Sequence, residues 1–178
     1  MRHKKLLSIA LTVLAISSLA LTGCRKEAAE LKLDAPFTKA SWDSTKEDII
    51  AEEGDDYETY DSVYNGETYT YDKKYENKDG TVKYMFDDKD KLMCVAWAYG
   101  STDTQELEDL YTKINDDMTD EHGDSGYSTE EEKNSINNYG NIWYLDTGDI
   151  IISAMVTEEN KALQFAFLHP DVSYSEDE

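Results

Sequence analysis

The sequence has few of the residues that carry most enzyme chemistry: two cysteines and three histidines among 178 residues. Nucleophilic catalysis needs a base beside the nucleophile, and only His122 and His169 lie beyond the N-terminal region. One stands at the predicted end of a helix, the other follows the last predicted strand, and no G-x-S-x-G motif is present. Cys94 has apolar neighbours and no adjacent cation, which is typical of an inert packed thiol. We therefore predict no catalytic residues and no cofactor.

Metal-binding patterns are missing too. There is no C-x-x-C and no paired-histidine spacing for a transition metal. Asp87, Asp88 and Asp90 crowd one predicted turn and Asp55 and Asp56 another, but an EF-hand needs a D-x-D-x-D-G run with a later Glu. We interpret these acids as solvated turn residues and predict no metal site. A calcium-dependent adhesion module is kept as a lesser alternative.

Basic residues are scarce, at 17 Lys and Arg against 39 Asp and Glu, and the net charge is −22. Such a chain repels nucleic-acid phosphates and anionic lipid head groups, so nucleic-acid binding is excluded. The favoured interpretation is a solvated acidic exterior. Attraction to a basic partner or to Ca²⁺ is the sharper alternative.

The only long apolar run is near the N-terminus. Residues 6–23 carry no charge and follow Arg2, Lys4 and Lys5. The run barely reaches the roughly 18 residues needed to span a bilayer, and four Ser and Thr residues interrupt it. A basic start, a short apolar core and small residues at its end indicate a signal peptide, residues 1–23.

The run ends in Leu21-Thr22-Gly23-Cys24, which resembles the lipobox of bacterial lipoproteins. The resemblance implies cleavage before Cys24, acylation of its sulfur by palmitate-type chains, and a membrane-anchored protein facing the extracytoplasmic side. Two or three acyl chains anchor stably where one does not. The alternative is a secreted protein with a free Cys24.

Acylation and cleavage would have two consequences for the rest of the chain. Cys94 would have no disulfide partner, so the core would have to hold the domain together. Loss of three basic residues would leave 14 basic against 39 acidic residues, a net charge of −25. We predict a polar tether over residues 24–36, one domain over 37–172 and an acidic tail over 173–178.

Two helices are predicted. Ser44 and Glu47 fit a capping box, and Gly54 provides a stop, so a short helix is expected over residues 45–53. A longer helix is expected over residues 104–121, ending near Gly123, because five apolar residues share one face. They are Leu107, Leu110, Tyr111, Ile114 and Met118.

Seven strands are predicted from alternating segments separated by turn signals such as Asn65-Gly66, whose two residues would both take positive φ. They are residues 57–64, 67–75, 81–86, 91–99, 141–146, 149–156 and 161–168. The two helix ends are offset by 69 residues and the last hairpins of each half by 70. This predicts an α+β fold of two tandem helix-plus-meander halves, about 37–100 and 101–172, although the repeat is weak and chance is the alternative.

The repeat also predicts which strand faces are buried. Leu163, Phe165 and Phe167 alternate with smaller residues and should face the core. The equivalent first-half set is Met93, Val95 and Trp97. The opposite face would then carry Leu92, Cys94, Ala96 and Ala98, either covered by the other half, which we favour, or available to a partner.

The whole pattern of capped helix, Tyr-rich meander, amphipathic helix and Trp-bearing hairpin, over residues 37–170, resembles small bacterial lipoprotein domains. These are of the β-lactamase-inhibitor-protein-like type and the outer-membrane-assembly (BamE-type) type. The resemblance implies binding or scaffolding rather than catalysis.

Tyrosine is the one residue type with a suggestive pattern. Tyr69, Tyr71 and Tyr75 alternate on one predicted strand beside Tyr60 and Tyr64. Such rings suit a protein or sugar surface, although the core side of a half-buried meander is the slightly favoured interpretation of one such row. We predict a non-enzymatic envelope lipoprotein that binds a protein or peptide through these tyrosines. The alternative is a carboxylate-based surface hydrolase or a glycan-binding protein.

Overall fold

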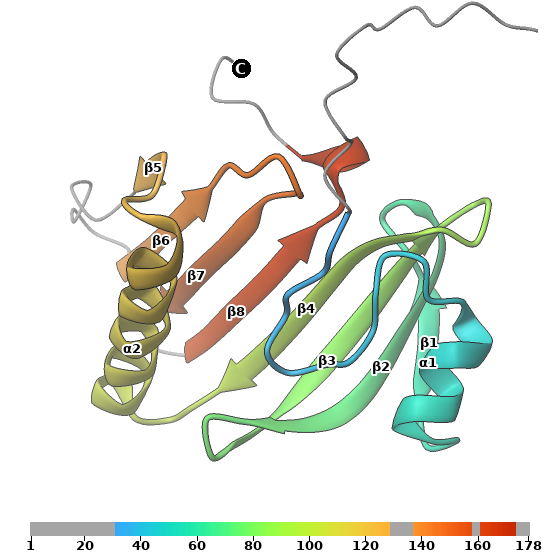
Figure 1. Ribbon diagram of the computed structural model, residues 1–178. Coiled ribbons are helices and arrows are strands. Elements are labelled where there is room, and N and C mark those ends of the chain that lie inside the picture. The colour runs from blue at the N-terminus through green and yellow to red at the C-terminus, as the bar shows by residue number, and fades with distance from the viewer. Residues whose placement is uncertain (1–30, 129–136, 158–160, 174–178) are drawn as a thin grey trace, which may run out of the picture.

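The computed structural model describes residues 31–128, 137–157 and 161–173. The predicted signal peptide, Cys24 and all but the first residue of the acidic tail lie outside these residues. The described residues form two α-helices and one antiparallel sheet of eight strands in the order β1-β2-β3-β4-β8-β7-β6-β5 (Figure 1). The predicted mixed α+β class is confirmed, with strand predominating.

The strands are β1 Glu58–Asp61, β2 Asn65–Tyr75, β3 Lys78–Asp87, β4 Leu92–Gly100, β5 Tyr127–Ser128, β6 Asn137–Trp143, β7 Ile150–Val156 and β8 Lys161–Leu168. The prediction of seven strands missed β5, which has only two residues. It also placed β6 four residues too late, because the uncharged run after Gly140 outweighed the polar residues that begin the strand.

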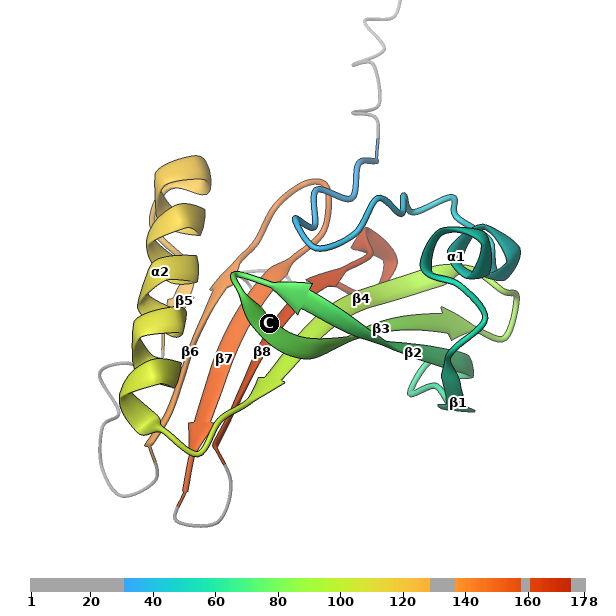
Figure 2. The ribbon, with the colours of Figure 1, turned by 90° about the horizontal axis from the view of Figure 1, so that it is seen from below.

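One side of the sheet is covered by both helices and by the N-terminal segment between them. Figure 2 shows α1, α2 and residues 31–44, here called the strap, above the same side of the sheet. The strap contains no helix or strand and turns at residues 36–37 and 42–43. In its first part the buried residues alternate: Leu33, Ala35 and Phe37 face the core. The ring of Phe37 lies edge-on to Phe165 and Phe167 of β8. Packing therefore begins before the predicted boundary at residue 37.

Helix α1, Lys46–Glu53, begins one residue later than its sequence signal. The capping box is formed by Thr45 and Asp48, whose side chains each accept from the other's backbone N–H at 3.2 and 2.9 Å. Ser44 instead accepts from the N–H of Ser41 at 2.9 Å. Thr45, the residue after Ser44, is the N-cap because the side chain of Asp48, one turn later, accepts from its backbone N–H. The helix ends at Gly54, as predicted, with φ of +103°.

Helix α2, Thr104–His122, matches its prediction closely. All five predicted face residues are buried, and Gly123 ends the helix at φ +83°. Asp103 caps the N-terminus by accepting from the N–H of Gln105. No helix among the described residues is long and apolar enough to cross a membrane.

The first hairpin turns earlier than Asn65-Gly66 suggested. The turn closes with the N–H of Asn65 donating to Ser62 O at 3.1 Å, and Asn65 alone takes positive φ, at +70°. Gly66 is instead required by close approach, since a Cβ there would stand 2.1 Å from Asp87 O. The tight two-residue turn lies at Glu76-Asn77, where both residues have positive φ.

The predicted core faces are mostly correct. Val95 and Trp97 of β4 and the three β8 residues are buried in the main core. Leu92 and Met93 are the exceptions, because a β-bulge interrupts the alternation at the start of β4. Phe86 pairs with Leu92 and Met85 with Cys94, which leaves Met93 as the extra, unpaired residue. Leu92 therefore joins the main core. Strict alternation cannot anticipate an inserted residue.

Candidate functional site

The side of the sheet opposite the two α-helices and the strap, here called the bare face, has no α-helix over it in the described part of the chain (Figures 1 and 2). The short 3-10 helix η2, Pro170–Val172, packs against one end of this face through Val172. The strand register defines its residues. One continuous row of cross-strand partners crosses all eight strands from β1 to β5. It consists of Glu58, Thr70, Lys83, Ala96, Ala166, Ile151, Ile142 and Tyr127.

Charge is absent from the centre of the bare face. Of all residues in the chain, 31% are charged, yet the bare-face residues of β4, β8 and β7 include none. These residues are Cys94, Ala96, Ala98, Gly100, Ala162, Gln164, Ala166, Leu168, Ile151, Ser153 and Met155. In a protein this acidic, eleven uncharged and mostly small or apolar residues distinguish this face from the rest of the molecule, although four of them are buried.

One end of the bare face is already packed. Cys94, Ala96, Ala166 and Leu168 form a small second apolar cluster, and partly buried Tyr64, Met85, Ile151 and Val172 lie against it. Burial raises the pKa of the Cys94 thiol to about 12, which keeps it protonated and unreactive at neutral pH. Of the residues predicted on this face of β4, Cys94 and Ala96 are buried and Ala98 is partly buried. Their cover comes from side chains of both halves and not, as favoured, from the other half alone. Further along the face Gln164, Ser153 and Met155 are exposed.

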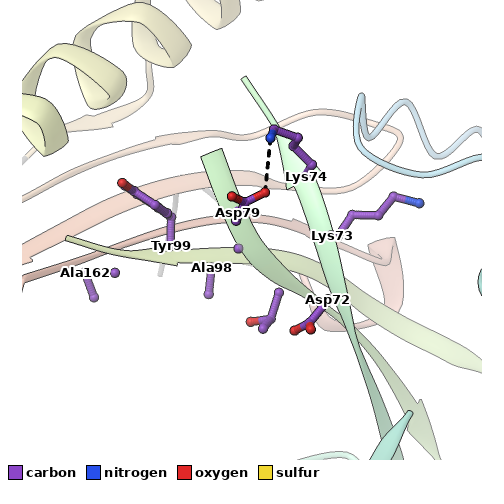
Figure 3. Close-up of a pocket in the computed structure, with 10 residues that line it drawn as sticks. Asp72, Lys73, Lys74, Asp79, Ala98, Tyr99 and Ala162 are labelled. Carbon is purple, nitrogen blue, oxygen red and sulfur yellow. Dashed lines mark ion pairs between the residues drawn. The ribbon is translucent and has the colours of Figure 1, made fainter. Parts of the chain in front are cut away.

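The other end of the bare face is hollowed. A depression of about 640 Å³ is lined by residues of β2, β3, β4 and β8 (Figure 3). Ala98, Gly100 and Ala162 belong to its small-residue part. Figure 3 shows the Ala98 and Ala162 side chains pointing to one side and the Tyr99 ring to the other. The depression exists because neighbouring strands present short side chains at the same level.

The rim of the depression is charged. Asp72, Lys74 and Asp79 come from the end of the β2–β3 hairpin, and Lys74 Nζ lies 3.2 Å from Asp79 Oδ1. Both side chains of this pair are well exposed, at 61% and 89%. Asp72 takes part in none of the ion pairs found among the described residues.

The five predicted binding tyrosines do not form one surface. Tyr69 and Tyr71 are buried, and Tyr75 packs against the core between the Phe37 and Trp97 rings. Burial raises the pKa values of Tyr71 and Tyr75 to about 12. The row on β2 is therefore the core side of the meander, which is the interpretation slightly favoured for such a row.

The two remaining tyrosines lie on the bare face, near its packed end. Tyr60 pairs with Thr68 and is 48% exposed, and Tyr64 packs beside Cys94. The central bare-face residues on β7 and β8 were not predicted from the sequence. Their only signal in the sequence was the lack of charge at alternating positions: Ser153, Met155 and Gln164. These positions show no pattern of bulky side chains.

Two polar networks hold the covered side in place. The Glu53 carboxylate accepts from Lys73 Nζ at 2.7 Å and from the Tyr84 hydroxyl at 2.6 Å, and Thr38 of the strap lies 2.7 Å from that hydroxyl. These bonds join α1, the sheet and the strap. The second network centres on Glu106 of α2.

The Glu106 carboxylate is bonded by Lys78, by Tyr99 at 2.9 Å and by Ser101 at 2.6 Å. The Lys78 ammonium and these hydroxyls lower the pKa of Glu106 to about 2. The network fixes the start of α2 to the ends of β3 and β4. Both networks support the sheet from its helix-covered side.

The histidines and turn acids have structural roles. His169 is 2% exposed, packs edge-on to Trp42, and its Nδ1 accepts from the N–H of Asp171. Burial lowers its pKa. Asp87 accepts from the N–H groups of Lys89 and Lys91, which closes its turn. Among the described residues no group of three His, Cys, Asp or Glu is placed to hold a metal ion.

Comparison with known proteins adds no relative. No family model, no curated protein and no solved structure matches the chain. The candidate site is therefore defined by the geometry of this molecule alone.

Proposed function

We propose that this protein is a lipid-anchored, extracytoplasmic binding protein that docks another protein on the bare face of its sheet. The observation that carries the proposal is the contrast between a strongly acidic chain and a charge-free sheet centre left uncovered by both helices. Depletion of charge at the centre is the compositional mark of interface cores. The lipobox resemblance at Cys24 supports the anchor and the location.

The size of the face suits this role. Strands lie about 4.8 Å apart and rise about 3.3 Å per residue, so six strands of about eight residues, with the packed end included, span roughly 750 Å². A standard protein interface buries about 800 Å² per partner. The edge strands β1 and β5 have only four and two residues, so they offer little for an added strand. A folded partner lying on the face fits better than an added peptide strand.

We also propose that the domain is a tandem repeat of a helix followed by four strands. Each half has that element order, and the last strands of the halves, β4 and β8, pair antiparallel at the centre of the sheet. Helices α1 and α2 both end at a glycine of positive φ. The bare face would then be built equally by both halves.

The test is an in-cell cross-link and pull-down with the intact protein. Gln164→Arg places a charge at the exposed centre of the face, and Thr112→Arg adds the same charge on exposed α2 as the matched control. We expect Gln164→Arg to lower partner recovery at least tenfold, since an interface must desolvate an unpaired charge. The control should match the unsubstituted protein.

Membrane placement is tested in the same experiment with Cys24→Ala. A partner recovered only with the anchored form supports both the anchor and the docking face. Equal recovery with Gln164→Arg and Thr112→Arg would overturn the docking face. Recovery of wall glycan in place of a protein would move the function to the glycan-binding or hydrolase alternative.

A further inference from the structure

The depression at the β2–β3 end of the bare face is an open hollow whose lining includes the small residues Gly80, Ala98, Gly100 and Ala162. On the covered side of the sheet Gly80 packs closely, because a Cβ there would meet Ala98 O at 2.5 Å and the Trp97 ring at 2.7 Å. Trp97 is fully buried in the core, and its indole N–H donates to Lys73 O at 2.9 Å. These contacts fix β2, β3 and β4 against one another beneath the depression.

The chemistry of the cavity has two parts. Its β4 and β8 residues Ala98 and Ala162 offer methyl groups, which suit the aliphatic part of a side chain. Its β2–β3 rim offers Asp72, together with the Lys74–Asp79 pair. Lys74 is paired with Asp79, and Lys73, which also lines the cavity, is paired with Glu53. The charge of the lining that has no ion pair among the described residues is therefore the Asp72 carboxylate.

We propose that this cavity receives a single basic side chain, arginine or lysine, that projects from the surface of a folded partner protein. Its aliphatic stem would lie on Ala98 and Ala162, and its charged head would meet Asp72. The inference rests on the proposed docking face and names the anchor residue of its partner. Hot-spot pockets of interfaces are commonly filled by arginine or an aromatic residue.

Other occupants fit less well. An apolar side chain would bury the Asp72 carboxylate without a partner, which costs free energy. An acidic side chain would meet both Asp72 and the field of a chain with a net charge of −22. A second copy of this chain carries that same charge, so self-association through this face is opposed by repulsion.

The first test uses a defined probe. Acetyl-Gly-Arg-Gly-amide is titrated into the isotope-labelled intact protein in 0.15 M NaCl, with acetyl-Gly-citrulline-Gly-amide as the uncharged isostere. We expect saturable NMR shifts at the backbone amides of Asp72, Thr81 and Ala98, and at least tenfold weaker binding of the citrulline peptide. Equal binding of both peptides would overturn the proposal.

The matched variants are Asp72→Asn and Asp116→Asn, which remove the same charge from the rim and from exposed α2. We expect Asp72→Asn to weaken binding of the arginine peptide at least fivefold. Asp116→Asn should leave the affinity for that peptide within twofold of the unsubstituted protein. Shifts spread over the whole acidic surface, or equal effects of the two variants, would show non-specific attraction and reject the cavity as the site.

The in-cell experiment separates this inference from the docking face itself. A photo-crosslinker is placed at Thr81, which lines the cavity, and at Ser153, on the exposed face outside it. Capture from both positions, with Lys or Arg in the partner peptide joined at Thr81, supports the cavity. Capture from Ser153 alone, or a peptide without a basic residue, rejects the cavity and keeps the docking face. If no protein is captured from either position, or only a second copy of this chain, both the cavity and the docking face are rejected.

Discussion

The strap gives the sharpest test of the fold, because two leucines two residues apart have opposite environments. Leu33 is 8% exposed and belongs to the core cluster, whereas Leu31 is 47% exposed. Both would lie in a flexible tether if packing began only after Pro36. Leu33→Ala and Leu31→Ala delete the same atoms, so their difference isolates burial.

The expected magnitude follows from the burial of Leu33. Full burial of a leucine side chain is worth about 1.5–3 kcal/mol, and the cavity left behind raises Leu→Ala in cores to about 2–5 kcal/mol. Leu33 lies at the start of the packed chain, so we expect about 2 kcal/mol. An exposed Leu31→Ala change should cost about 0.5 kcal/mol or less.

The assay is urea unfolding followed by tryptophan fluorescence. Trp42, Trp97 and Trp143 are all buried, so their emission reports the loss of the core. At about 2–4 °C per kcal/mol for a domain of this size, Leu33→Ala should also lower Tm by about 4–8 °C. Equal losses below about 0.5 kcal/mol for both variants would refute the packing of the strap.

Three further predictions concern other parts of the molecule. In urea unfolding, Tyr71→Ala should lower the free energy of unfolding by about 3 kcal/mol or more and Tyr60→Ala by less than about 1 kcal/mol, because only Tyr71 is in the core. Similar losses for the two variants would contradict their assigned faces. The pKa of Glu106 is lowered in the folded state, so the contribution of this carboxylate to stability should be complete above about pH 4.5 and fade towards pH 2. The difference in unfolding free energy between the unsubstituted protein and Glu106→Gln should therefore narrow over that range, and a difference that widens on acidification would contradict the lowered pKa. Native Cys94 should react with a thiol reagent at least a hundredfold more slowly than in denaturant, as it is 4% exposed; comparable rates would place it at the surface.

Local signals predict the structure correctly where one short segment decides the outcome. The α2 face follows from five apolar residues in helical spacing, and the burial of Phe165 and Phe167 follows from alternation on β8. Gly54 and Gly123 mark both helix ends because few other residues take positive φ easily. The acidic composition predicts, on electrostatic grounds, that the protein does not bind nucleic acid, and this stays a prediction.

Tertiary structure decided which faces are covered. Alternation assigns Tyr69 and Tyr71 to one side of β2, but only the position of α1 and the strap makes that side the core. The bulge at Met93 and the pairing of β4 with β8, some 70 residues later, depend on non-local contacts that no window of sequence contains. The bare face and its cavity arise from that pairing, because it brings Ala98 and Ala162 to the same end of one sheet. The sequence thus determined the elements and their periodicity, and the packing of distant segments determined which face of the sheet the α-helices and the strap cover.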